Sequence, residues 1–394
     1  MTASALPFSI EEYATRLNKT RQAMSEHGLD ALFVTDPSNQ AWLTGYDGWS
    51  FYVHQGVVVL PDADPIWWGR LMDTQGALRT VWMGFDRVIG YEDSFVQSTE
   101  LHPMQDLSVL LDSLGLSAGR IGVEMENYYF SAKAMHVLEA SLPNATFEDA
   151  TGVVNHLRAV KSQAEIAFMR KAAAISEKMI DGLLERVEPG VAKNEVVAEL
   201  YRDAIRGVGD AWGDYPAIVP MLPSGDDAAA PHLTWDGRPF KSGEATFFEI
   251  AGCYRRYHTP FCRTLFLGKP PEDILAAEAA IVEGLEAGLE AGRAGNRACD
   301  IANALSDALN RHGIDRVGRC GYSIGLSYPP DWGERTISLR STDETVLEPG
   351  MTFHFMPGLW RDTWGLEITE SILIRETGAA ETFCNRPRQL FVKP

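Results

Sequence analysis

Residues 247–268 read "FFEIAGCYRRYHTPFCRTLFLG" and place one carboxylate, Glu249, directly after two phenylalanines. Apolar surroundings raise the pKa of a carboxyl group, and such a group can act as a general base or as a nucleophile. The alternative is an ion pair between Glu249 and Arg255 or Arg256, which would make the carboxylate structural. The segment is therefore a candidate catalytic strand.

His232 is a second candidate for chemistry, shortly after the turn-forming residues "PSG" at 223–225. An imidazole has an unperturbed pKa near 6.5, so it can accept and donate protons near neutral pH. The alternative is a histidine held by a hydrogen bond in a loop. A carboxylate and an imidazole together would supply an attacking group and a proton carrier for hydrolysis.

The first part of the chain alternates helix and strand signals, typical of an α/β domain. Ser9 and Glu12 have the spacing of a capping box and begin an amphipathic helix that runs toward Gly28. Buried strands are expected at 31–37, 56–69 and 120–126, and a helix at 131–143. We assign residues 1–157 to this first domain.

The pattern changes near residue 157, where a long amphipathic helix is expected to run to Gly190, with Ser162 as N-cap and Glu165 three residues later. Further elements are expected as a helix from about 193, strands within 245–267, and helices at 274–294 and 298–312. The length of 394 residues suits two domains, and we assign 158–394 to the second.

Composition excludes several classes of partner. The net charge of -19 disfavours nucleic acid, because the protein would repel the phosphate backbone. No apolar run approaches the roughly 18 residues of a membrane helix, and the first residues lack a signal-peptide pattern, so a cytoplasmic location is expected. The five cysteines contain no CxxC pair that would indicate a zinc site or a redox pair.

Several motifs occur in the order found in the creatinase/aminopeptidase P/prolidase group, which the chain resembles over nearly its whole length. They are "LRAVKSQAEIAFMRKAA", "YHTPFCRTLF", "VLEPGMTF" and "GLEITESILI". The resemblance implies a small α/β N-terminal domain of creatinase type, followed by a catalytic domain with the pita-bread fold.

Peptidases of that group hold two divalent metal ions with two Asp, one His and two Glu. The resemblance aligns these positions with Glu249, Pro260, Tyr322, Met356 and either Thr369 or Glu370. A hard divalent ion needs several oxygen or imidazole donors, which proline and methionine do not provide. We therefore expect no metal and no other cofactor.

Within the group, the chain most resembles the ectoine hydrolase family, through "GYDGWSFYVHQGVVVLP", "WWGRLMD" and "DWGERTISLR". This resemblance implies a small-molecule substrate, ectoine or 5-hydroxyectoine, whose cyclic amidine ring is opened to N-acetyl-2,4-diaminobutyrate. An amidinium carbon is already electron-poor, so a polarising metal is redundant. Cys262 stands where creatinase-like sequences have Glu, which disfavours creatine as the substrate.

The implied reaction assigns roles to four catalytic candidates. Glu249 would attack or activate water, His232 would carry the proton to the leaving nitrogen, and Tyr322 would donate to the tetrahedral intermediate. Glu370 completes this set. Tyr322 could equally be a buried tyrosine with a backbone partner.

Substrate-binding candidates are arginines, aromatic residues and further polar residues. Arg335, and after it Arg340, are candidates for the substrate carboxylate, because guanidinium pairs with carboxylate in a bidentate manner. Aromatic candidates for the amidinium face are Trp49, Trp332, Trp360 and Trp364. The other polar candidates are His54, Asp331, His258 and His354.

A homodimer is expected, because in the family the N-terminal domain reaches into the pocket of the other subunit; Trp49 and His54 are candidates for that contribution. Three alternatives stay open at this point: an amidinohydrolase acting on another small amidine or guanidine, a metal-dependent Xaa-Pro dipeptidase, and a binding protein without catalysis.

Overall fold

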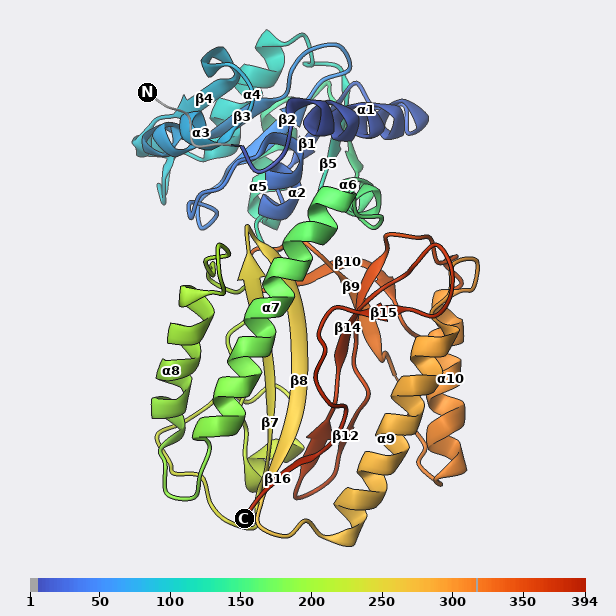
Figure 1. The fold of residues 1–394 in the computed structure, drawn as a ribbon. Coiled ribbons are helices and arrows are strands. Elements are labelled where there is room, and N and C mark those ends of the chain that lie inside the picture. Colours follow the sequence, from blue (N-terminus) through green and yellow to red (C-terminus); the bar gives the residue numbers. More distant parts are fainter. Residues whose placement is uncertain (1–5, 317) are drawn as a thin grey trace. The chain divides into compact units, whose positions relative to one another are not determined.

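The computed structural model describes residues 6–316 and 318–394, which form two compact units divided between Arg158 and Ala159 (Figure 1). The boundary expected from the sequence lies one residue earlier, between 157 and 158. Among the described residues, no helix is both long and apolar enough to cross a membrane.

The first unit is built on a six-stranded sheet with the order β4-β3-β2-β1-β5-β6. Its strands are β1 Ala31–Val34, β2 Gly56–Val59, β3 Ile66–Arg70, β4 Val88–Tyr91, β5 Arg120–Val123 and β6 Thr146–Asp149. The single strand expected at 56–69 is two antiparallel strands, β2 and β3, because "PDADP" at 61–65 forms the turn between them.

Both faces of this sheet are buried. Along β1 and β3, side chains alternate between two hydrophobic clusters, so that Phe33 and Trp68 lie in one cluster and Val34 and Trp67 in the other. The described α-helices of the unit are α1 Ile10–Glu26, α2 Pro37–Thr44, α3 Thr74–Thr80, α4 Pro103–Ser113, α5 Ala132–Ser141 and α6 Val153–Leu157. This is the α/β layer expected from the sequence.

The second unit begins with α7, Gln163–Arg186, whose predicted capping box is confirmed. The Glu165 N–H donates to Ser162 Oγ at 3.2 Å, and the Ser162 N–H donates to the Glu165 carboxylate at 2.9 Å. The helix begins directly after the expected N-cap and ends before the expected stop at Gly190. Residues 153–157 form the separate helix α6, and Val187 is already extended, two residues before a proline that disfavours helix in the residue preceding it.

Helix α7 lies directly on the hairpin of β7 Ala245–Tyr254 and β8 Tyr257–Leu267. A Cβ at Gly252 would come within 2.2 Å of the Ala172 carbonyl oxygen, so only glycine permits this close approach. The hairpin turns through Arg255 and Arg256, both with positive φ, as a two-residue type I′ turn requires.

A five-stranded sheet with the order β10-β9-β11-β14-β15 completes the second unit. Its strands are β9 Gly321–Ile324, β10 Gly333–Ser338, β11 Thr352–Phe355, β14 Glu370–Leu373 and β15 Glu381–Thr382. The remaining elements are α8 Lys193–Arg206, η4 Gly225–Ala229, α9 Glu272–Ala291, α10 Ala298–Arg311, the pair β12 Gly358–Trp360 and β13 Gly365–Glu367, and β16 Phe391–Lys393 beside β8. Within this unit, α7 and α8 flank the strands on one side and α9 and α10 on the other (Figure 1).

Candidate active site

Strand β7 carries Glu249 into the interior of the catalytic unit, opposite Cys262 on β8. Every residue of both strands is buried, and burial raises the pKa of Glu249 well above its ordinary value, with the nearby charge of Glu367 acting in the same direction. Among the described residues, no arginine forms an ion pair with this carboxylate, and Arg256 approaches Asp214 instead. The apolar environment expected for Glu249 is thus present.

Tyr322 and His354 lie beside Glu249, on the neighbouring strands β9 and β11, where they are direct partners in the ladder. His354 Nδ1 is 3.4 Å from Tyr322 Oη and 3.9 Å from the Glu249 carboxylate. The indole N–H of Trp332 donates to Tyr322 Oη at 2.7 Å. The structure thus brings together four residues named from the sequence: Glu249, Tyr322, Trp332 and His354.

Thr369 fixes the orientation of the His354 ring. Its hydroxyl oxygen accepts the Cys262 N–H at 2.8 Å and lies 2.8 Å from His354 Nε2, so the hydroxyl hydrogen is available to Nε2. Burial lowers the pKa of His354 to about 3, which keeps the ring neutral. We therefore assign the ring proton to Nδ1, on the side of Tyr322 and Glu249.

Tyr322 is held as a proton donor. Burial raises the pKa of Tyr322 well above its ordinary value, and the negative charge of Glu249 raises it further. The phenol therefore stays protonated. Because its oxygen already accepts the Trp332 N–H, its own hydrogen is free to point toward an acceptor beside Glu249. This is the arrangement required to stabilise a developing negative charge.

Glu367, at the end of β13, is a neighbour of Glu249 that the sequence analysis missed. It is 1% exposed, and neither carboxylate oxygen has a nitrogen or oxygen partner among the described residues. Burial raises its pKa to about 7, while contact with the Cys262 thiol and the charge of Arg316 oppose the shift. The available signal was its spacing of two residues from Thr369, which in an extended chain places both side chains on one face.

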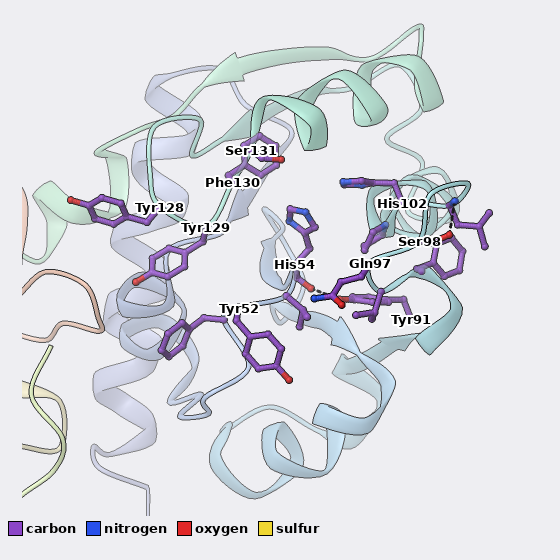
Figure 2. A pocket seen from close by; sticks show the side chains of 16 residues that line it. Tyr52, His54, Tyr91, Gln97, Ser98, His102, Tyr128, Tyr129, Phe130 and Ser131 are labelled. Carbon is purple, nitrogen blue, oxygen red and sulfur yellow. Dashed lines mark hydrogen bonds between the residues drawn. The ribbon is translucent and has the colours of Figure 1, made fainter.

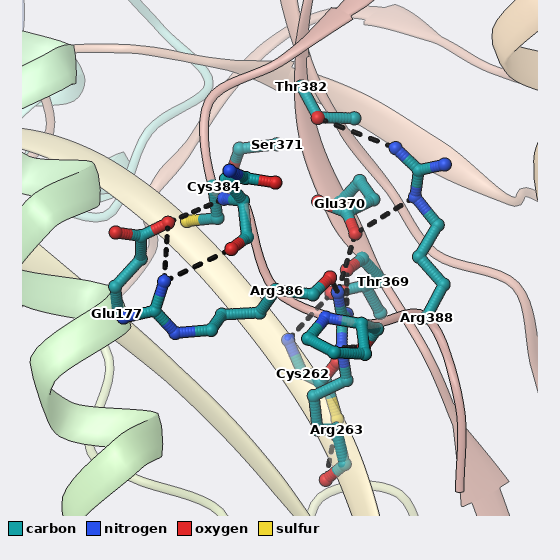
Figure 3. Close-up of polar contacts among 12 residues, drawn as sticks. Glu177, Cys262, Arg263, Thr369, Glu370, Ser371, Thr382, Cys384, Arg386 and Arg388 are labelled. Carbon is teal, nitrogen blue, oxygen red and sulfur yellow. Dashed lines mark hydrogen bonds and ion pairs between the residues drawn. The ribbon is translucent and has the colours of Figure 1, made fainter.

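Glu370 points into a different environment, shown in Figure 3. Its carboxylate accepts from Arg263 Nη2 at 2.6 Å and from Arg388 Nε at 3.3 Å. The Nη1 group of the same Arg263 donates to the backbone carbonyls of Cys262 and Thr369 at 2.8 and 2.7 Å. The structure therefore places this catalytic candidate in a buried ion pair that joins β8 to β14.

His232 is exposed on the loop that follows η4. In the described part of the chain, it has no hydrogen bond to Glu249, Tyr322 or His354. The η4 segment itself contacts β7 and β13, the strands that carry Glu249 and Glu367. A Cβ at Gly365 would lie 2.0 Å from the Ala228 carbonyl oxygen, so this segment rests directly on the backbone of β13.

The positions that align with metal ligands do not provide a suitable donor set. Pro260 lies in β8 opposite Ala251, and Met356 directly follows β11. Nowhere in residues 6–316 and 318–394 do three or more His, Cys, Asp or Glu side chains form a group that could hold a metal ion. The residues present therefore do not fit a pair of divalent ions.

Two further polar candidates are held by backbone contacts close to Trp332. His258 is buried, with Nε2 accepting the Ala217 N–H at 2.8 Å, and its ring lies 6.4 Å from that of Trp332. Burial lowers its pKa to about 3, so it is neutral. Asp331 accepts the Gly333 N–H at 2.9 Å. Both residues border the site without an observed contact to Glu249.

The two arginine candidates are exposed on or beside β10. Arg335 has a positive φ of 57°, and Arg340 donates to Ser338 Oγ at 3.2 Å. Of the tryptophans, Trp360 packs against a small cluster that includes Cys262, whereas Trp364 donates to Asp273 at 3.0 Å. Trp360 is therefore the indole of this pair that lies near the buried carboxylates.

Trp49 and His54 belong to the first unit. His54 lines a cavity of about 470 Å³ enclosed mainly by aromatic side chains, where its ring lies 4.9 Å from that of His102 (Figure 2). Burial, followed by the charge of His102, lowers the pKa of His54 to about 4. Trp49 is 56% exposed and its ring lies 4.9 Å from that of Phe51.

Comparison with known families and proteins agrees with this architecture. Residues 16–160 match the creatinase/prolidase N-terminal domain, and residues 167–376 match metallopeptidase family M24. The chain is 57% identical to the ectoine hydrolase of Halomonas elongata, with all of both chains covered. It is 40% identical to an uncharacterized hydrolase/peptidase of Sinorhizobium fredii, covering 98% of this chain and 99% of the relative.

Solved structures give the same fold. A dipeptidase PepE from Mycobacterium ulcerans superposes with a TM-score of 0.81 at 23% identity, covering 98% of this chain and 99% of that chain. An Xaa-Pro dipeptidase from Bacillus anthracis gives 0.81 at 19% identity, covering 97% and 100%. The expected creatinase-type domain followed by a pita-bread domain is confirmed. The chain is a hydrolase of metallopeptidase family M24, in the group that contains the ectoine hydrolase of Halomonas elongata.

Proposed function

We propose that this hydrolase opens the cyclic amidine ring of ectoine, and that 5-hydroxyectoine is a second candidate substrate. Water adds its oxygen to the amidine carbon, one ring C–N bond breaks, and the leaving nitrogen takes a proton, which gives N-acetyl-2,4-diaminobutyrate. The observation that carries the proposal is the buried pair Glu249 and Glu367, two carboxylates to which no Lys or Arg of residues 6–316 and 318–394 is bonded. Such a pair suits a cationic substrate, and the 57% identity to an ectoine hydrolase supports ectoine.

The reaction is proposed to need no metal ion. Support comes from Pro260 and Met356, which provide no ligand oxygen or imidazole at positions where the family resemblance expects metal ligands. A divalent ion would also repel an amidinium at short range, by about 4 kcal/mol per unit charge pair at 4 Å with an effective dielectric near 20. The positive charge of the substrate makes its carbon electrophilic without such an ion.

Each residue of the site receives a role under this proposal. Glu249 acts as the nucleophile or as the base that activates water. Tyr322 donates its phenol hydrogen to the intermediate, and His354 is the neutral partner that keeps Tyr322 and Glu249 in place. His232 carries the proton to the leaving nitrogen, which requires the loop after η4 to bring it to the substrate. Arg335 is proposed to bind the substrate carboxylate.

A homodimer is also proposed, following the family resemblance, with Trp49 and His54 of the partner subunit facing the substrate. Light scattering coupled to gel filtration would test it by giving twice the chain mass of 43.5 kDa. A mass of one chain, with full activity, would remove these two residues from the site.

The deciding experiment is turnover of ectoine by protein treated exhaustively with a chelator, with metal content measured on the same sample. NMR should show an acetylated diaminobutyrate at an undiminished rate. Activity that returns only with a divalent ion would overturn the metal-free mechanism. Cleavage of Xaa-Pro dipeptides without ectoine turnover would replace the proposed substrate.

A further inference from the structure

Glu367 contributes negative charge to the proposed site but has no assigned contact with the substrate, and its surroundings are unusual for a carboxylate. It is 1% exposed, and in the described part of the chain neither of its oxygens accepts a hydrogen bond from a nitrogen or an oxygen. A buried carboxylate without partners is unfavourable unless something supplies hydrogen-bond donors to it. Glu367 therefore requires either a proton or a ligand.

Arg316 and Arg263 donate their hydrogen bonds to groups other than the Glu367 carboxylate. Arg316 donates through Nε to the Gly358 carbonyl at 3.2 Å and through Nη2 to the Arg319 carbonyl at 3.1 Å. Arg263 uses Nε, Nη1 and Nη2 on backbone carbonyls and on Glu370. Neither guanidinium donates to Glu367, so the described part of the chain leaves this carboxylate without a cation partner.

The backbone of Glu367 is fixed by hydrogen bonds, so the missing side-chain partners do not come from a loose segment. Its N–H donates to Thr264 Oγ1 at 2.9 Å, and its carbonyl accepts from the same hydroxyl at 2.9 Å. Gly358 is its partner across the β12–β13 ladder. The unpartnered carboxylate is held rigidly beside Cys262 and within electrostatic reach of Glu249.

We infer that Glu367 is a substrate-binding residue that accepts an N–H of the substrate amidinium, while Glu249 faces the amidinium carbon. An amidinium is planar and carries N–H donors directed to either side of that carbon, so one carboxylate can bind a nitrogen while another approaches the carbon. The charge of the cation would also offset the repulsion between the two carboxylates. The identity of the substrate in this inference rests on the proposed function. The preference for a cation rests on the unpartnered carboxylate alone.

The test is the Glu367→Gln variant, which keeps the shape of the side chain but places an N–H₂ donor beside the N–H of the substrate. KM for ectoine should rise about 10- to 100-fold, the loss expected for one hydrogen bond to a charged group, with kcat changed far less. Glu376→Gln, an exposed carboxylate in the same unit, is the control and should match wild type. An unchanged KM in Glu367→Gln would overturn the inference.

Acetamidinium and its neutral counterpart acetamide separate this inference from the choice of substrate. Acetamidinium should raise the melting temperature of wild type and of Glu376→Gln but not that of Glu367→Gln, and acetamide should raise none. If ectoine is not turned over yet acetamidinium gives this pattern, the proposed function fails and the cation site stands. Equal stabilisation of wild type and Glu367→Gln by acetamidinium would remove the site. Glu367→Asp, which keeps the charge, should retain part of the acetamidinium response.

Discussion

Glu367 and Glu370 are three residues apart, are both buried, and have opposite surroundings. Glu370 is bonded to Arg263 and lies 3.3 Å from Arg388, whereas Glu367 has neither arginine as a partner. A paired carboxylate joins two strands, while an unpaired one is left available to a ligand. Two carboxylates in one short segment can thus serve structure and chemistry separately, and the difference lies in which cation each can reach.

The largest effect is expected from Glu249→Gln, which removes the charge of the other buried carboxylate that has no arginine partner among the described residues. Turnover should be abolished, because the amide is neither a base nor a nucleophile, while ectoine binding should stay measurable by calorimetry. Activity within a few-fold of wild type would remove Glu249 from the mechanism.

For the ion-paired carboxylate, Glu370→Gln should lower the free energy of unfolding by about 3 kcal/mol, because it leaves Arg263 buried without its counter-charge. Urea unfolding measures this, and kcat at a temperature where the variant is folded should stay within a few-fold of wild type. Loss of turnover with unchanged stability would instead show that Glu370 takes part in the reaction. The distinction between a structural Glu370 and a ligand-binding Glu367 would then be wrong.

His232→Ala tests whether the loop after η4 takes part in the reaction together with the unpaired carboxylates. The rate should fall about 10²- to 10⁴-fold, the usual loss when a general acid–base group is removed. The pH dependence of kcat should change with it, because the proposed proton carrier is gone. A negligible effect would make His232 a surface residue and leave the proton transfer to another group.

Tyr322→Phe should lower kcat about 10²-fold, as for the loss of one donor to a developing charge. KM should change little, since the contact strengthens in the transition state. If Tyr322→Phe lowers the free energy of unfolding but leaves kcat unchanged, the role of Tyr322 is limited to its hydrogen bond with Trp332.

The smallest effect concerns pH. The pKa of Glu367 is raised from 4.5 to about 7, so the folded state binds more protons than the unfolded chain between these values. Its contribution to stability is therefore complete below pH 4.5 and is lost as pH rises through 7, by at most about 3 kcal/mol. Glu367→Gln should be more stable than wild type at pH 8 but not at pH 4.5, as measured by urea unfolding. The same difference at both pH values would contradict the raised pKa.

The elements of the fold were largely predictable, because they depend on local signals. The capping box at Ser162 and the hydrophobic run of β7 and β8 are contained in a few neighbouring residues. Element ends were less predictable: α7 ends at Arg186, before the stop expected at Gly190.

The site was predictable only where a motif marked it. Glu249 and Tyr322 were found because the family resemblance aligned them with metal ligands. Glu367 was not found, since its importance comes from the absence of a partner, and that depends on where Arg263 and Arg316 direct their donors in three dimensions. The segment "GLEITE" contains both Glu367 and Glu370, and only the strand geometry separates their surroundings.

Gly365 has a consequence for protein engineering. Because the Ala228 carbonyl occupies the space that a side chain at 365 would need, this position sets how closely the η4 segment approaches the strand that carries Glu367. Alanine there would force the segment outward by roughly the difference between a 2.0 Å approach and van der Waals contact. Position 365 is thus a place to shift the η4 segment relative to β13 without changing any polar residue of the site.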